Sequence, residues 1–338
     1  MRVLTMQAID NIVVRTYFSS KALHMLDTPR SMLFVSGEKP ERFEKALAAG
    51  ADMVCIDLED AVHPARKNDA RAAVFDFAAR RAHAPQQGQG PQLAVRLNGL
   101  RTREGLADVA ALIACGARFD AVLLPKVEFA EDLSMFHAWA ADTFDALVAL
   151  VETPLGIEQA AAMAAAVHRG APKLSALMLG GADLAAELGA DFGWDGLLGA
   201  RGRLVNAARS AGLAAWDVPH LDLDDLAALA AETAAVARMG FGCKTAIHPR
   251  QIETIHAAFA PQPAELQWAH ALLESHAARE ASPDAAGAFM FGGKMVDAPV
   301  LRKARRIAGL VQPDSPAPFL PAADSASASR LQSAPIPT

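Results

Sequence analysis

The chain has 338 residues, 52% of them hydrophobic, which is enough for one large core or two ordinary ones. A net charge of −6 excludes the basic class of nucleic-acid-binding proteins, and no apolar run approaches the roughly 20 residues of a membrane-spanning helix. Three isolated cysteines, Cys55, Cys115 and Cys243, fit neither a disulfide framework nor a zinc site, so we expect a cytoplasmic globular protein.

The first part of the chain alternates between strand-like and helix-like segments. Residues 1–29 have scattered charge without the apolar core of a signal peptide, and we interpret them as an N-terminal extension. Short apolar runs, most of them followed by a helical stretch, then begin at Ser31, Asp52, Leu93, Ala121, Ala146, Ala176, Leu213 and Cys243. Eight such repeats predict an α/β fold, a (β/α)8 TIM barrel over residues 30–260. No GxGxxG motif follows the first run, which disfavours a dinucleotide-binding sheet.

The pattern changes after the barrel. PAELQWAHALLESHAARE, from Pro263, predicts one more amphipathic helix, and the Gly-rich turn GAFMFGGKMVDAP leads to the short basic helix VLRKARRIAGL. We expect residues 261–311 to form a C-terminal helical extension that acts as a lid or oligomerisation segment. Residues 312–338 are mostly Pro, Ser and Ala without a period, which predicts a disordered tail.

One carboxylate in the fifth repeat has an unusual position. Leu147 to Val151 are all apolar, as in a strand buried on both faces, and Glu152 follows where the strand should end. Thr153 and Pro154 then break the strand before a helical pattern. A charge at the end of a dry strand is unfavourable unless a partner or a metal compensates it, so we expect Glu152 to be the centre of a site.

Polar residues also end most of the other predicted strands. They are Asp57, Glu59, Asp60, Arg96, Asn98, Lys126, Glu128, Asp183, Asp217 and His248. In a barrel, the carboxyl ends of the strands meet at one face, where active sites lie. Several carboxylates with one arginine predict a site for a hard cation such as magnesium, which prefers oxygen ligands.

Eight short motifs in this order resemble those of the HpcH/HpaI aldolase/citrate lyase β-subunit family. They are RSMLFVSG, IDLEDAV, VRLNG, LLPKVE, VETPLGI, GGADLAAELG, AIHPRQI and GGKMVDAPV, and the resemblance runs from about residue 30 to residue 310. The resemblance implies a metal-dependent barrel, with Mg²⁺ or alternatively Mn²⁺, that makes or breaks a carbon–carbon bond beside a thioester. It implies an acyl-CoA substrate such as malyl-CoA or citramalyl-CoA, a small 2-oxo acid (glyoxylate or pyruvate), and a homotrimer or dimer of trimers.

The resemblance also suggests roles for individual residues. Glu152 and Asp183 correspond to the metal ligands, Arg96 to the arginine that binds substrate oxygens, and Asp297 to an acid that a neighbouring subunit inserts into the site. Asp57 is the acid of the second motif that we expect to face the site. Substrate contacts are implied for Phe34, Lys39, Lys45, Ala182, Ile247 and His248. Ser36 stands where the family usually has proline, so the first loop is expected to be less rigid.

Structural roles compete with several of these assignments. Asp297 precedes Pro299 at a predicted helix start, where a helix cap is the alternative, and His248 before Pro249 can simply close the last strand. Lys39 and Lys45 also suit a solvated helix face.

Three other functions compete with the CoA-ester lyase. The first is a Schiff-base aldolase that uses Lys126, although nearby carboxylates should keep this lysine charged. The second is the β subunit of citrate lyase, acting on an acyl group held by a carrier protein. The third is a homologue that only binds ligand, which the intact pair Glu152 and Asp183 disfavours.

Overall fold

The computed structural model describes residues 29–82, 90–280 and 288–308. The predicted tail, and the predicted N-terminal extension apart from residue 29, lie outside these ranges. In the described part of the chain, no helix is long and apolar enough to cross a membrane.

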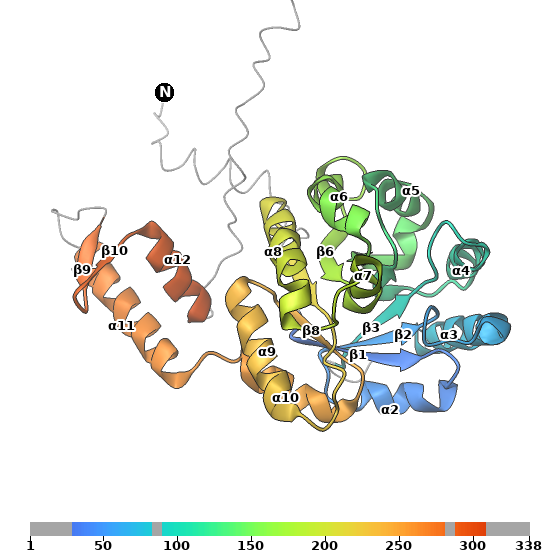
Figure 1. Cartoon of the computed structure of the whole chain (residues 1–338), viewed down its shortest axis with the longest axis horizontal. Coiled ribbons are helices and arrows are strands. Elements are labelled where there is room, and N and C mark those ends of the chain that lie inside the picture. The colour runs from blue at the N-terminus through green and yellow to red at the C-terminus, as the bar shows by residue number, and fades with distance from the viewer. Residues whose placement is uncertain (1–28, 83–89, 281–287, 309–338) are drawn as a thin grey trace, which may run out of the picture.

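Eight parallel strands close into a barrel, which confirms the predicted fold (Figure 1). Each strand pairs with its neighbours in chain order, and β8 pairs with β1. The strands are β1 Ser31–Ser36, β2 Met53–Asp57, β3 Gln92–Arg96, β4 Phe119–Leu124, β5 Phe144–Val151, β6 Leu174–Leu179, β7 Ala214–Asp217 and β8 Cys243–Ala246.

Helices surround the barrel, as expected for strands that are apolar on both faces. The α-helices are α2 Phe43–Leu47, α3 Lys67–Ala82, α4 Arg103–Ala114, α5 Ala130–Ala140, α6 Pro154–Ala164, α7 Gly181–Leu188, α8 Trp194–Ser210, α9 Leu226–Met239 and α10 Ile252–Phe259. Short 3-10 turns are η1 Pro40–Arg42, η2 Pro64–Arg66, η3 Ala141–Thr143, η4 Ala165–His168 and η5 Pro249–Gln251.

The residues of β5 show how one apolar run serves two cores. Val148 and Leu150 point into the barrel, where they pack with residues such as Met178. Leu147 and Ala149 point outward and pack in the larger core under the helices. Because side chains alternate across a strand, both faces must be apolar, and a continuous apolar run is the result.

The C-terminal segment forms a separate unit beside the barrel (Figure 1). It consists of α11 (Pro263–Glu280), a hairpin of β9 (Phe289–Phe291) and β10 (Lys294–Val296), and α12 (Ala298–Ile307). Gly292 and Gly293 both have positive φ, 56° and 75°, which a two-residue hairpin turn requires and which glycine adopts readily. The unit has its own small core, built from residues such as Leu272, Phe289 and Leu301.

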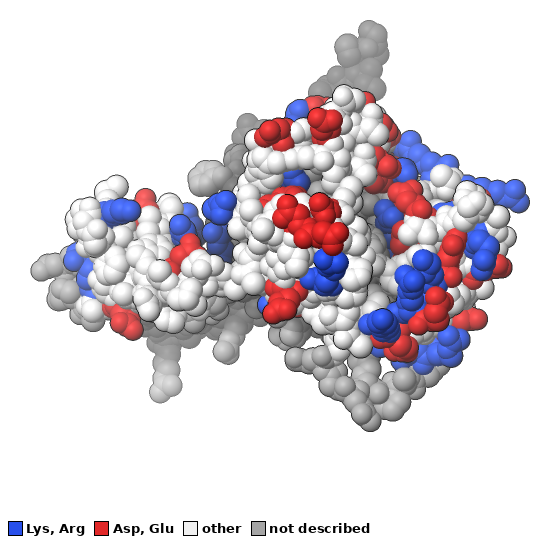
Figure 2. All heavy atoms as spheres, turned by 60° about the horizontal axis from the view of Figure 1, so that its bottom comes forward, with Lys and Arg blue, Asp and Glu red and all other residues white. Residues whose placement is uncertain are grey.

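The charged surface of the barrel is mixed. Figure 2 shows acidic and basic side chains interspersed over the described residues of this face, without an extended basic stripe. This distribution agrees with the slightly acidic composition.

Candidate active site

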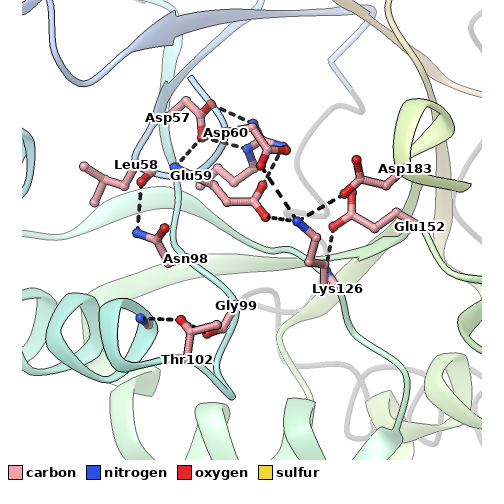
Figure 3. Close-up of polar contacts among 12 residues, drawn as sticks. Asp57, Leu58, Glu59, Asp60, Asn98, Gly99, Thr102, Lys126, Glu152 and Asp183 are labelled. Atoms are coloured by element: carbon pink, nitrogen blue, oxygen red, sulfur yellow. Dashed lines mark hydrogen bonds and ion pairs between the residues drawn. The ribbon is translucent and has the colours of Figure 1, made fainter. Parts of the chain in front are cut away.

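Seven of the predicted polar residues lie together at the carboxyl ends of β2 to β6 (Figure 3). Direct contacts connect Asp57, Glu59, Asp60, Arg96, Lys126, Glu152 and Asp183. They come from different strands and loops, so only the closed barrel brings them together.

Glu152 is placed by a sharp change from strand to helix. The Thr153 hydroxyl accepts a hydrogen bond from the Gly156 N–H at 3.0 Å, and Pro154 occupies the first turn, so α6 begins directly after the carboxylate. Glu152 is buried, and its Oε1 accepts the Lys126 backbone N–H at 2.7 Å. Burial, followed by the nearby charge of Glu59, raises the pKa of Glu152 to about 8.

Gly180 makes room for this carboxylate. A Cβ at position 180 would lie 2.3 Å from the Glu152 Cβ and 2.4 Å from its Oε2, closer than real contacts allow. Gly180 also precedes α7, whose first turn contains Asp183. The Asp183 side chain is 38% exposed, so its carboxylate faces the open end of the barrel while Glu152 lies deeper.

Arg96 is held by two carboxylates. Its Nε and Nη2 donate to the two oxygens of Asp57 at 2.7 and 2.6 Å, a bidentate pair. Its Nη1 lies 2.9 Å from Oε2 of Glu59, an ion pair that lacks hydrogen-bond geometry. The guanidinium carbon lies 5.1 Å from the centre of the Phe34 ring. Asp57 is buried, and its two oxygens accept hydrogen bonds from Arg96 and from two backbone N–H groups, so it holds the arginine in place; its predicted catalytic role stays a prediction.

Lys126 lies among the carboxylates. Its Nζ is 2.8 Å from Oε1 of Glu59, 3.1 Å from Oδ2 of Asp183 and 3.8 Å from Oδ1 of Asp60. Burial alone would lower the pKa of Lys126, but the hydrogen bonds and charges of Glu59 and Asp183 outweigh it and raise the pKa. A charged ammonium is a poor nucleophile, which disfavours the Schiff-base alternative.

The carboxylates fit a magnesium ion. The donor set consists of oxygens alone, and Glu152 and Asp183 approach each other from two neighbouring strand ends (Figure 3). In the described part of the chain, no group of three His, Cys, Asp or Glu side chains is arranged to hold a metal. Two carboxylates suit magnesium in particular, because this ion keeps several waters that substrate oxygens can replace.

Four of the predicted strand-end residues are not part of this cluster. Asn98 binds Asp108 and Lys67, and Glu128 accepts the Thr153 hydroxyl at 2.8 Å. Asp217 is buried on the outward face of β7, where it pairs with Arg201 and Lys244. His248 caps η5.

Of the six further substrate contacts that the resemblance implies, Phe34 contacts the cluster, through Arg96. Lys39 precedes η1 and Lys45 lies in α2, and both are exposed on the β1–β2 connection. Ala182 is exposed in the first turn of α7. Ile247 and His248 are exposed after β8, and their N–H groups donate to the buried Gln251 side chain.

Ser36 braces the loop after β1. The Ser36 hydroxyl donates to the Ala61 carbonyl at 2.6 Å and accepts the Glu38 N–H at 3.2 Å. These hydrogen bonds hold the loop against the segment after β2.

Asp297 caps α12 in the separate C-terminal unit. Its Oδ1 accepts the Val300 N–H at 3.2 Å. The capping role that the sequence suggested is therefore present, although it does not exclude a second role.

Glu59 and Lys126 are more central to the cluster than the sequence indicated. The sequence placed Glu59 only among the polar strand-end residues and Lys126 as a rival nucleophile, yet together they connect Arg96 with Asp183. The available signal was their position in the IDLEDAV and LLPKVE motifs at strand ends.

Residues 30–249 match the family described as HpcH/HpaI aldolase/citrate lyase. The chain is 34% identical over 293 residues to the citrate lyase subunit beta of Haemophilus influenzae, an alignment that covers 82% of this chain and 95% of that protein. It is 29% identical to the mitochondrial citramalyl-CoA lyase of Homo sapiens, in an alignment that covers 87% of this chain and 88% of that protein. It is 36% identical to the (3S)-malyl-CoA thioesterase of Cereibacter sphaeroides, in an alignment that covers 81% of this chain and 91% of that protein.

Solved structures agree with these relatives. The fold is similar to that of protein CitE from Mycobacterium tuberculosis in complex with magnesium, acetoacetate and coenzyme A, with a TM-score of 0.68 and 35% identity. The comparison covers 84% of this chain and 99% of that one.

Proposed function

This chain belongs to the HpcH/HpaI aldolase/citrate lyase family and is a carbon–carbon lyase, and from that premise we propose that it acts on a short β-hydroxyacyl-CoA thioester such as malyl-CoA or citramalyl-CoA. Retro-aldol (Claisen-type) cleavage of such a thioester yields an acyl-CoA and a small 2-oxo acid, glyoxylate or pyruvate. The mitochondrial citramalyl-CoA lyase of Homo sapiens and the CoA-bound CitE structure support a CoA ester as the substrate class.

The observation that carries this proposal is that Arg96 lies in one cluster with the carboxyl groups of Glu152 and Asp183 at the carboxyl ends of the strands. Glu152 and Asp183 would hold Mg²⁺, or alternatively Mn²⁺. The bound ion supplies a Lewis acid for the oxo-acid carbonyl. Arg96, oriented by Asp57, would donate to the enolate oxygen that develops on the thioester side, as preorganised donors do in other enzymes.

A general base must take the proton of the substrate hydroxyl as the carbon–carbon bond breaks, and an acid must then give a proton to the enolate carbon; we assign the second step to Asp297 of a second copy of the chain. Asp297 lies in the C-terminal unit, beyond α11 and the β9–β10 hairpin, and Figure 1 shows this unit beside its own barrel. A site shared in this way requires an oligomer, and we propose a homotrimer or a dimer of trimers in the cytoplasm.

The proposal is tested by assaying the purified protein with malyl-CoA, citramalyl-CoA and methylmalyl-CoA. The oxo acid and free CoA are measured separately, with Mg²⁺ and after EDTA treatment. We expect the oxo acid to form in equal amount to the acyl-CoA, and Glu152→Gln and Asp183→Asn to lose most of this activity while remaining folded. Full activity after EDTA, or a borohydride-trapped adduct at Lys126, would contradict the mechanism. Free CoA without an oxo acid would indicate thioester hydrolysis instead.

A citrate lyase β subunit is the second candidate, because the alignment covers 95% of that protein from Haemophilus influenzae. It would perform the same cleavage on an acyl group carried by a protein thiol. Activity with a citryl-carrier protein and none with the CoA esters would favour this candidate.

A further inference from the structure

We infer that the Lys126 ammonium acts as a counter-cation for the carboxylates of the cluster, here called the carboxylate ring. It neutralises them before a divalent cation binds, and it must leave Asp183 when that cation arrives. The inference rests on the proposed metal role of Glu152 and Asp183. It assigns to Lys126 control over how tightly the metal binds, a function distinct from catalysis.

The first support is that one residue contacts both proposed metal ligands. The Lys126 backbone N–H donates to Oε1 of Glu152 at 2.7 Å, and its Nζ lies 3.1 Å from Oδ2 of Asp183 (Figure 3). A cation held by these two side chains would lie close to the ammonium, and like charges at such a distance repel.

The second support is the charge balance of the ring. Four carboxylates (Asp57, Glu59, Asp60 and Asp183) share two cations, Arg96 and Lys126, and the Glu152 carboxyl group lies beside them. Arg96 is engaged by Asp57 and Glu59, so within this ring Lys126 is the cation that reaches Asp183. The Lys126 ammonium therefore stabilises the carboxylates when no metal is bound, and it must move away from Asp183 when a metal binds.

The third support is the backbone of Lys126. Its φ of 54° is the one positive value for a residue other than glycine in the described part of the chain. This left-handed conformation is unfavourable for a residue with a side chain, and glycine adopts it more readily. A lysine at this place brings an ammonium into the ring while its N–H still binds Glu152.

The ammonium also has room to leave. The Lys126 side chain is 44% exposed, whereas Glu59, its other close partner, is 6% exposed. The flexible stem can therefore swing toward solvent while Glu59 stays paired with Arg96.

The test measures Mn²⁺ binding to the full-length protein at one fixed pH and salt concentration, by the loss of the free-ion signal in electron paramagnetic resonance. Lys126→Gln and Lys126→Gly remove the charge, and the glycine variant also suits the backbone. Lys126→Arg keeps the charge, and Lys303→Gln, on the exposed face of α12, is the matched control. We expect the two neutral variants to bind Mn²⁺ about tenfold more tightly, and the arginine and control variants to resemble the wild type.

A second readout follows the side chain itself. Amine labelling with acetic anhydride, quantified by mass spectrometry, should modify Lys126 severalfold faster with Mg²⁺ than without, while Lys303 reacts at an unchanged rate in the same molecule. Folded neutral variants that bind Mn²⁺ as the wild type does, or less tightly, would overturn the inference while the proposed lyase function stands. If neither the wild type nor any variant bound Mn²⁺, the proposed metal role of Glu152 and Asp183 would be wrong, and the inference about Lys126 would be wrong with it.

Discussion

Glu152 shows how a single residue can be stabilised at a place that is unfavourable for its charge. It is buried, yet one oxygen accepts the Lys126 N–H and the other has space only because residue 180 is glycine. Burial disfavours the ionised form, so Glu152 must release a proton when it binds a cation. Two predictions follow from these contacts.

Gly180→Ala should abolish metal binding and activity by displacing Glu152. The added Cβ would lie 2.3 Å from the Glu152 Cβ, so the buried Glu152 would have to move. Gly199→Ala is the matched control, because no atom lies within 4 Å of a Cβ there and the residue is inside α8. We expect this control to keep full activity and to gain about 0.5–1 kcal/mol of stability. A Gly180→Ala variant with normal Mn²⁺ affinity would refute the steric argument.

The metal-free protein should lose stability as pH rises, through the raised pKa of Glu152. The folded chain retains a proton on Glu152 up to about pH 8, whereas the unfolded chain releases it near pH 4.5. The contribution is therefore complete below about pH 4.5 and is lost as pH approaches 8. In EDTA, the melting temperature of Glu152→Gln relative to the wild type should rise between pH 5.5 and 8, because glutamine does not titrate. Glu158→Gln, in an exposed ion pair on α6, should show no such trend, and parallel curves for all three proteins would contradict the assignment.

At the scale of elements, a buried charge network fastens the last two strands to their helices. Lys244 on β8 donates to Asp217 on β7 and to Glu232 on α9, both at 2.7 Å. Arg201 on α8 binds the same two carboxylates. Both Lys244 and Asp217 are fully buried, so each charge depends on the others for compensation.

Lys244→Met should therefore destabilise the protein by about 3–5 kcal/mol, because it leaves two carboxylates short of one cation. The midpoint of urea unfolding measures this loss. The exposed pair of Arg118 and Asp145 provides the comparison, with side chains that are 52% and 49% exposed. Asp145→Asn should change stability by no more than about 1 kcal/mol. Equal effects of the two substitutions would mean that burial does not strengthen the network.

At the scale of the whole molecule, the C-terminal unit has a core of its own and an exposed apolar pair. Met290 and Met295 face each other across the hairpin and are 64% and 67% exposed. Asp297 follows directly after this hairpin. This arrangement suits a segment that reaches the barrel mouth of a second copy.

Mixing Asp297→Ala with Glu152→Gln should restore part of the activity if sites are shared between copies. Each variant alone is expected to be inactive, but a hybrid oligomer contains an intact Glu152 site beside an intact Asp297. If Asp297 served its own chain, no subunit would have both groups and the mixture would stay inactive.

The capping role of Asp297 is separated by a second substitution. Asp297→Asn should keep the cap of α12, whereas Asp297→Ala should lose about 0.5–2 kcal/mol. Activity lost in Asp297→Asn at an unchanged melting temperature would identify a catalytic role.

Much of the fold could be predicted because its signals are local. The apolar run from Leu147 to Val151 identifies a doubly buried strand, and the following Thr153 and Pro154 identify a helix start. Repetition of this pattern eight times is enough to predict the barrel, and the helix predicted from Pro263 spans the same residues as α11. The β9–β10 hairpin was missed, because its three-residue strands are too short for a period to be recognised.

The sequence by itself determined the strands, the helix starts and the set of polar residues at strand ends. Only the tertiary structure decided which of those residues meet. Asp57 and Asp217 both end a strand, yet Asp57 points inward to Arg96 while Asp217 points outward to Lys244. The side-chain period of a strand is two, so a shift of one residue at the strand end reverses the face. Registry with the neighbouring strands sets that face, and it depends on residues far apart in the chain, such as Asp57 and its partner Arg96.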